Sequence, residues 1–426
     1  MSRVVVIGAG AMGLAAAHRA VSLGHDVDLI EADSVAGGMA AHFDFGGVSI
    51  ERFYHFVCKS DEPTFALMKE LGIGDRMRWR PTSMGYYMKG QIHSWGDPIS
   101  LLKFPHLSLI AKIRTGLQMF LTTKAKSFAS IESKTAREWL EGGSGREVYN
   151  TLWKRLMELK FYELANDVSA SWIATRVRRI GNSRRSIFQE ELGYIEGGSQ
   201  TLVDALVSAY TTQGGRLHLG MPVERIETEA GRTTGVTAAG KFFPADAVIS
   251  TVPTPYISTL VPSLPEASKA KYDAIRNIGV VCLLFKLKKS VSRNFWINIV
   301  DESIEIPGLI EFSNLRPVES TIVYVPYYMP TSQAKWQWSD SQFVEEAFGY
   351  LRKVNPAITR DDLIEAKVGR LKHAQPVCEP NFLDKLPPIQ TPIAGLQIAD
   401  TCYYYPEDRG IAESVRYGRN MAEALT

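Results

Sequence analysis

The chain begins with the stretch that decides its fold, Val4-Val5-Val6-Ile7-Gly8-Ala9-Gly10-Ala11-Met12-Gly13. Its first four residues are apolar and β-branched, which is typical of a buried parallel strand. Residues 14–22 then show helical spacing, and Gly24 ends that helix before a second apolar run at 27–30. The order strand, glycine-rich turn, helix, strand predicts a βαβ unit whose GxGxxG turn is the fingerprint of a dinucleotide site.

Each glycine of this fingerprint has a physical task in holding a pyrophosphate. Gly8 permits the tight turn after the strand, Gly10 leaves room for the pyrophosphate, and Gly13 lets the helix pack closely on the sheet. The helix N-terminus favours the negative charge of the ligand. Glu31 ends the second strand, where a carboxylate accepts hydrogen bonds from a ribose diol. From this unit we expect cofactor contacts at Gly8, Gly10, Ala11, Met12, Gly13, Glu31 and Ala32.

A signal peptide is the alternative interpretation of the same stretch, because Arg3 precedes an apolar run rich in alanine. Glycines break that run, and a strand that ends in an acid follows it at the spacing of a βαβ unit. The dinucleotide site therefore explains the stretch better.

The composition narrows the class of protein. Lys plus Arg number 48 against 46 for Asp plus Glu, so the chain has none of the basic excess of a nucleic-acid-binding protein. The four cysteines form no CxxC pair, which predicts neither a metal site nor a disulfide framework and favours the reducing cytoplasm. At 426 residues the chain is long enough for two or three domains.

One apolar stretch, residues 101–121, is interrupted by Lys103, Lys112 and Arg114 and is therefore too polar to span a bilayer. Its spacing predicts an amphipathic helix. The first interpretation is a helix packed on the protein's own core. The second is a helix that enters a membrane surface or lines an apolar route to the substrate, which would give a cytoplasmic protein a peripheral membrane contact.

The order of segment types predicts a discontinuous layout. Patterns of an α/β domain occupy residues 1–80, 191–264 and 386–426, and the strands expected between 216 and 251 extend its sheet. Residues 81–190 are mostly helical, and 265–385 hold alternating apolar runs of a second sheet. The expected fold class is α/β, with a Rossmann-like domain built from three segments and an inserted α+β substrate domain that carries a helical insert.

Several motifs together resemble the flavin-dependent amine oxidase superfamily, which includes monoamine oxidases, protoporphyrinogen oxidase and carotenoid desaturases. They are the fingerprint followed by Gly37-Gly38, the helix start 197–202, the strand 223–226, the strand and turn 249–253, and the tail strand that ends in Asp400. The nearest likeness is to bacterial protoporphyrinogen-oxidase-like proteins. The resemblance implies FAD in a two-domain fold of the glutathione-reductase type. It adds these cofactor residues: Gly37, Gly38, Met39, Arg52, Phe53, Tyr54, Val223, Thr251, Val252, Asp400, Gly410, Ile411 and Ala412.

Departures from the family pattern concern the substrate more than the cofactor. Met39 replaces an arginine that often follows the double glycine, Ala399 replaces a glycine, and 403–409 replaces a turn of small residues. A short stretch, 52–56, is also similar to the aromatic and histidine segment beside the flavin of UDP-galactopyranose mutase.

Three residues are candidates for chemistry at the flavin, where the cofactor takes the hydride and the protein supplies position and charge. His55 lies among aromatic residues and is either a neutral binding or proton-accepting group or a core histidine. Lys160 lies on a partly apolar helix, and the resemblance implies a lysine near flavin N5; a solvated lysine is the alternative. Tyr404 is the expected aromatic wall of the site.

Arg176 and Arg179 lie three residues apart on one predicted helical face. They are candidates to bind a carboxylate or phosphate of the substrate, and a solvated basic face is the alternative.

Three functions remain open. The leading hypothesis is an FAD-dependent oxidoreductase that removes a hydride from a C–N or C–C bond of a small or lipid-like organic substrate. The alternatives are a redox-neutral flavin-dependent mutase acting on a sugar nucleotide and a dinucleotide-binding protein without catalysis. A single fingerprint argues against an internal NAD(P)H site.

Overall fold

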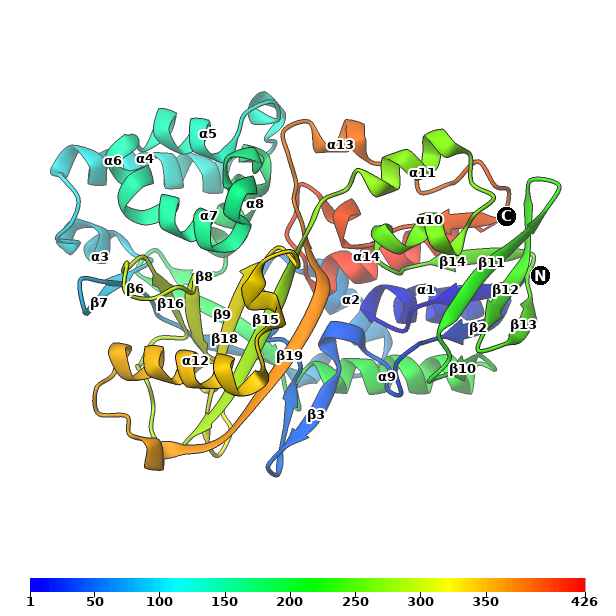
Figure 1. Cartoon of the computed structure of the whole chain (residues 1–426), viewed down its shortest axis with the longest axis horizontal. Coiled ribbons are helices and arrows are strands. Elements are labelled where there is room, and N and C mark those ends of the chain that lie inside the picture. Colours follow the sequence, from blue (N-terminus) through cyan, green and yellow to red (C-terminus); the bar gives the residue numbers. More distant parts are fainter. Residues whose placement is uncertain (426) are drawn as a thin grey trace.

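A computed structural model describes residues 1–425 as an α/β protein built on two large sheets (Figure 1). The first sheet is parallel and five-stranded, and its central strand β1 is covered on both faces. Val4 and Val6 face one core cluster, whereas Val5 and Ile7 face another, which explains why the run is apolar at every position. The strand order is β10 (Arg216–His218), β2 (Asp26–Ile30), β1 (Arg3–Ile7), β14 (Ala247–Ser250) and β20 (Leu396–Ile398).

Three helices pack on one face of this sheet. Gly418 permits the close approach of two of them, because a Cβ at that position would lie 2.2 Å from the Met12 carbonyl oxygen. The first helix follows β1 directly, whereas the third comes from the end of the chain. These helices are α1 (Ala11–Ser22), α9 (Ser199–Thr212) and α14 (Ile411–Glu423).

A small antiparallel sheet covers part of the other face, together with α10 (Ile257–Leu260) and α11 (Glu266–Asp273). The expectation that residues 223–244 extend the first sheet is therefore wrong. Ala230, Gly231, Ala239 and Gly240 all have positive φ, so two tight turns fold these strands back on one another. The sheet consists of β11 (Val223–Glu229), β12 (Arg232–Ala238) and β13 (Lys241–Pro244).

The second large sheet has seven strands and packs against α12 (Asp340–Val354). Its long strands are almost wholly apolar on the buried side, as the alternating runs after residue 265 predict. β6 and β7 form the expected hairpin over 85–92. The strand order is β19 (Leu363–Pro376), β15 (Asn277–Leu287), β18 (Thr321–Met329), β17 (Gly308–Glu311), β16 (Trp296–Ile299), β6 (Met84–Met88) and β7 (Gln91–Trp95).

The helical insert follows this hairpin. The single helix expected over 101–121 is instead two helices, because Pro105 in the connecting turn cannot continue a helix. A π-helical turn, Tyr149–Trp153, directly precedes α7. The helices are α3 (Pro98–Lys103), α4 (Leu109–Lys124), α5 (Ala136–Gly143), α6 (Arg146–Val148), α7 (Lys154–Phe161) and α8 (Ala170–Asn182). Within residues 1–425, no helix combines the length and apolarity needed to cross a bilayer.

Two smaller sheets connect the parts of the chain. The first is the hairpin of β3 (His42–Phe45) and β4 (Val48–Glu51), and the second consists of β5 (Met77–Pro81), β9 (Gln189–Ile195) and β8 (Arg184–Ser186). Two short helices, α2 (Glu62–Glu70) and α13 (Phe382–Lys385), complete the fold. Strands from the start, middle and end of the chain meet in the first sheet, and the exact division into two domains stays a prediction.

Candidate active site

A cavity of about 1100 Å³, which we call the large cavity, opens where β1, β2, β14 and β20 end. Ligands of open parallel sheets bind at these carboxyl ends. The lining brings together residues as far apart in the sequence as Ile7 and Ser414, which are separated by 407 positions. Predicted cofactor residues on its wall are Gly8, Gly10, Met12, Glu31, Ala32, Gly38, Met39, Arg52, Phe53, Val223, Thr251, Val252 and Asp400.

The fingerprint glycines have the surroundings that their predicted tasks require. A Cβ at Gly13 would lie 1.7 Å from the Gly8 carbonyl oxygen, so only glycine lets α1 start this close to β1. A Cβ at Gly10 would meet nothing within 4 Å among residues 1–425, because this backbone faces the cavity. Gly37 donates its N–H to the Ala9 carbonyl at 2.7 Å, which places the second glycine pair beside the first.

The acid of the second strand is held by the backbone. The Glu31 carboxylate accepts hydrogen bonds from Ala9 N at 2.7 Å and Asp33 N at 2.9 Å. Across the same wall, Arg52 forms an ion pair with Asp33. Each Glu31 oxygen keeps a lone pair free, so the residue can still accept a hydrogen bond from a hydroxyl group.

Asp400 joins two strand ends. Its carboxylate accepts hydrogen bonds from Cys402 N at 2.8 Å and from Thr254 N at 2.6 Å, in the loop after β14. Gly410 then begins α14, and neither α14 nor α1 has a side-chain N-cap. Two long helices therefore direct uncapped N–H groups at the cavity walls, which suits an anionic dinucleotide.

A second cavity of about 300 Å³, the small cavity, shares Met39, Phe53, Thr401, Tyr404 and Ser414 with the large one. It is lined mostly by aromatic and apolar side chains of the helical insert and the seven-stranded sheet. Its wall includes the predicted cofactor residues Ala11, Gly37, Tyr54, Gly410 and Ile411. Gly13 and Ala412 line neither cavity; Gly13 acts by packing, and Ala412 lies one residue inside α14.

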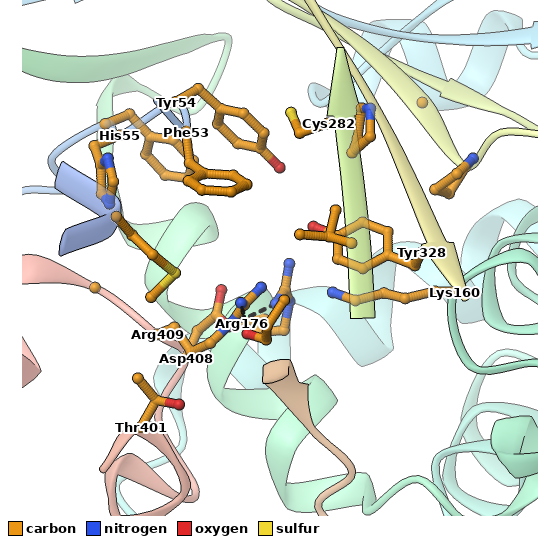
Figure 2. Close-up of a pocket in the computed structure, with 18 of the residues that line it drawn as sticks. Phe53, Tyr54, His55, Lys160, Arg176, Cys282, Tyr328, Thr401, Asp408 and Arg409 are labelled. Atoms are coloured by element: carbon orange, nitrogen blue, oxygen red, sulfur yellow. Dashed lines mark hydrogen bonds and ion pairs between the residues drawn. The ribbon is translucent and has the colours of Figure 1, made fainter. Parts of the chain in front are cut away.

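Lys160 lines the small cavity with a partly buried side chain (Figure 2). Its Nζ lies over the rings of Trp172 at 5.0 Å and Tyr328 at 4.9 Å, and it forms no ion pair within the part of the chain that the structure describes. Burial, assisted by Arg176 and Arg409, lowers the pKa of Lys160 well below the ordinary lysine value. The alternative of a solvated lysine is therefore wrong.

The two predicted arginines reach the small cavity but are engaged by carboxylates. Arg176 pairs with Asp408 at 2.7 Å, and Arg179 contacts both oxygens of Asp61 at 3.1 and 2.7 Å. Both line the small cavity, so the alternative of a solvated basic face is wrong. Figure 2 shows Arg176, Asp408 and Arg409 grouped opposite Tyr54.

The remaining candidates, His55 and Tyr404, line the walls of the small cavity. His55 lies next to Phe53 and Tyr54, and its Nδ1 has no hydrogen-bond partner among residues 1–425. Burial lowers the pKa of His55, which favours the neutral ring. Tyr404 separates the two cavities, and its hydroxyl is hydrogen-bonded to Ser414 at 2.8 Å.

A family profile described as flavin-containing amine oxidoreductase matches residues 13–380 of this chain. The chain belongs to this family. The resemblance and the expected α/β fold are thereby confirmed, and the cofactor that the family name prescribes is a flavin, here FAD.

The curated relatives of this chain are distant. The 15-cis-phytoene desaturase of an Oncidium hybrid cultivar is 24% identical over 281 residues, which cover 61% of this chain and 48% of the desaturase. The chain spans about half the length of the curated relatives it matches.

Solved structures with a similar fold align with 99% of this chain. One named as a protoporphyrinogen oxidase, from Exiguobacterium sp., is 16% identical, with a TM-score of 0.77 over 99% of this chain and 98% of its own. Reduced UDP-galactopyranose mutase is 15% identical, with a TM-score of 0.76 over 99% of this chain and 95% of its own. At these identities the likeness shows the shared fold alone.

In this chain, β19 supplies cations that the sequence did not reveal. Lys367 and Lys372 line the large cavity, on which Met39 stands in place of the usual arginine. The lysines of β19 belong to no recognisable sequence motif. They reach the large cavity, which the first sheet forms, only because β19 pairs with β15. Trp172 of α8, whose ring lies 5.0 Å from Lys160 Nζ, was also missed, because no local pattern connects it with Lys160.

Proposed function

We propose that the chain is an FAD-dependent oxidoreductase that removes a hydride from a C–N or C–C bond of an apolar, uncharged or anionic substrate. The observation that carries the proposal is the position of Lys160, a partly buried lysine without a carboxylate partner among the described residues, against aromatic rings in a cavity that adjoins the large cavity. An unpaired cation removed from water destabilises the fold. A role in proton transfer therefore explains a lysine at this position better than a role in stability does.

The reaction removes a hydride from a C–H bond and a proton from an adjacent N–H or C–H bond. FAD supplies the hydride acceptor when it is bound. The proton needs a base, and Lys160 Nζ is a neutral amine at a lower pH than an ordinary lysine because burial and Arg176 lower its pKa. We assign Lys160 the role of proton acceptor, and Tyr404 and His55 the role of walls that fix the reacting groups against each other.

The charge of the small cavity bears on the substrate. Lys160, Arg176, Arg179 and Arg409 line it, whereas Asp408 is its one carboxylate within residues 1–425, and that carboxylate is paired with Arg176. A diamine would bring a second cation to a wall that offers it no free carboxylate. An uncharged substrate, or one with a carboxylate for Arg176 or Arg409 to bind, fits better.

Anaerobic flavin spectroscopy tests the proposal. The purified protein should carry FAD, and a polyene precursor, a porphyrinogen or a carboxylate-bearing amine should bleach it. Lys160→Met should keep the bound flavin and slow bleaching by about 100-fold or more. Wild-type bleaching should also accelerate as pH rises through the lowered pKa of Lys160.

Lys154→Met is the matched control. Lys154 lies on the same helix with 55% of its side chain exposed, so its loss should leave the bleaching rate unchanged. Equal rates for the Lys160 and Lys154 variants would contradict the base assignment. Turnover of a sugar nucleotide only after prior reduction of the flavin, without net colour change, would favour a mutase. A flavin that responds to no substrate would favour a dinucleotide-binding protein without catalysis.

A further inference from the structure

Helix α4 buries its polar face and exposes its apolar face, which is the reverse of a helix packed on the core of its own protein. Its small and polar side chains, Ala111, Thr115, Gln118 and Thr122, are buried against the insert. Its large apolar side chains are each 56–73% exposed, and they are Leu109, Ile110, Ile113, Leu117, Phe120 and Leu121. The first interpretation of residues 101–121, a helix packed on its own core, is therefore wrong for this face.

Neighbouring elements enlarge this surface. Ile99 and Leu102 of α3 are about half exposed, and Lys112 Nζ fixes α3 to α4 through the Leu102 carbonyl at 2.7 Å. The turn between β8 and β9 exposes Ile187 and Phe188. We call these side chains and those of α4 the apolar face.

Hydrogen bonds hold the β8–β9 turn beside the two helices. Asn182 donates to the Thr123 carbonyl at the end of α4 at 3.2 Å, and Arg184 donates to the Gly96 carbonyl just before α3. The helices α3 and α4 lie at the end of the molecule remote from the five-stranded sheet (Figure 1).

The segment that carries α3 and α4 is rich in cations, and the nearest carboxylates, Asp97 and Glu147, accept hydrogen bonds at the starts of the two helices. Residues 98–131 contain no Asp or Glu. The cations of this segment are Lys103, Lys112, Arg114, Lys124 and Lys126, and Arg185 of the β8–β9 turn adds another.

We propose that the apolar face docks on the surface of a bilayer that contains anionic lipids, with the leucine, isoleucine and phenylalanine side chains among the acyl chains and the lysines at the headgroups. Exposed apolar area of this extent marks an interaction site, and an excess of cations beside it selects a negatively charged partner. A second copy of the chain fits less well, because a two-fold contact through α4 would bring two sets of cations together. The proposal is independent of the proposed chemistry.

Helix α4 does not line the small cavity itself, but it packs on a helix that does. Helix α4 packs on α8, and Arg178 of α8 donates to the Ala125 carbonyl at 3.3 Å. Trp172 and Arg176, on the same helix, line the small cavity. Docking through α4 thus places the substrate cavity close to the bilayer, where an apolar substrate is dissolved.

Vesicle sedimentation tests the proposal with the full-length holoprotein. Vesicles of phosphatidylcholine with an equal part of phosphatidylglycerol should carry the protein down at low salt, and high salt should release much of it. Ile113→Glu/Leu117→Glu should weaken binding by about tenfold or more without lowering the unfolding temperature, since both side chains are solvent-exposed. Lys103→Gln/Lys124→Gln should weaken binding to the anionic vesicles by a similar factor.

Leu383→Glu is the matched control, because Leu383 is 56% exposed on α13, outside the apolar face, and its replacement should leave binding unchanged. Wild-type protein that stays in the supernatant with the anionic vesicles at low salt would overturn the proposal. So would a lipid-free dimer, seen by sedimentation velocity, that Ile113→Glu/Leu117→Glu converts to a monomer, because a second copy would then cover the face.

Discussion

Replacement of Gly13 by alanine is expected to destabilise the fold itself, before any effect on cofactor binding. The new Cβ would lie 1.7 Å from the Gly8 carbonyl oxygen, whereas ordinary contact begins at 3.4 Å. Both partners are backbone, so the start of α1 must move away from β1 by well over 1 Å. Overpacking of this kind costs about 3 kcal/mol, the upper end of its usual range. In a protein of 426 residues, whose entropy of unfolding is about 0.9 kcal/mol/K, that lowers the unfolding temperature by about 3 °C.

Gly10→Ala is the matched change, because a Cβ at Gly10 meets nothing within 4 Å among residues 1–425 and the φ of −70° suits alanine. The apoprotein should lose less than about 1 kcal/mol, the cost of a poorer N-cap. FAD binding should nevertheless fail, because the methyl group occupies the place of the pyrophosphate.

The assay is thermal unfolding of both apoproteins together with the flavin content of the proteins as purified. Alanine is a better helix former than glycine by about 1 kcal/mol, so Gly13→Ala would be stabilising if the clash were absent. An unfolding temperature of that variant at or above the wild-type value would refute the argument. Equal losses for the two apoproteins would refute it as well.

Two further changes test charges outside the cavities. Burial raises the pKa of Glu311 to about 7, so its contribution to stability is complete below about pH 4.5 and declines by about 3 kcal/mol as pH rises through 7. Glu311→Gln should remove this decline in urea unfolding measured between pH 5 and 8, and an unaltered decline would point to another group. Arg316→Met should cost about 3 kcal/mol, because it removes the guanidinium 2.8 Å from the buried Glu51 carboxylate and leaves that carboxylate only its longer contacts with His42 at 3.4 Å and Ser199 N at 3.3 Å. The double variant Glu51→Gln/Arg316→Met should recover much of that loss, and no recovery would show that the pair is not the cause.

Local signals predicted the fold well where neighbours in sequence are neighbours in space. The run 4–7, the GxGxxG turn and the strand at 26–30 interact with each other directly, so their pattern alone specifies the βαβ unit. The prediction failed for the strands at 223–244, since periodicity identifies a strand but not its partner. It failed again for 101–121, where spacing revealed an apolar stripe but not the direction in which the stripe faces.

The candidate site shows the same division. The positions of Glu31 and Asp400 at strand ends followed from the sequence, because an apolar run that ends in an acidic residue is a local pattern. The engagement of Arg179 by Asp61, across 118 positions, was not visible. A lysine on a helix is usually solvated, and only the rings around Lys160 decide that this one is partly buried.

The sequence by itself determined the dinucleotide unit, the flavin family and the order of the segments, because these depend on backbone geometry that glycine, β-branched and acidic residues impose locally. Tertiary structure alone decided the charge balance of the small cavity and the outward direction of the α4 apolar face. Burial and pairing are properties of groups brought together from distant parts of the chain, and they set both the pKa of Lys160 and the exposure of Ile113.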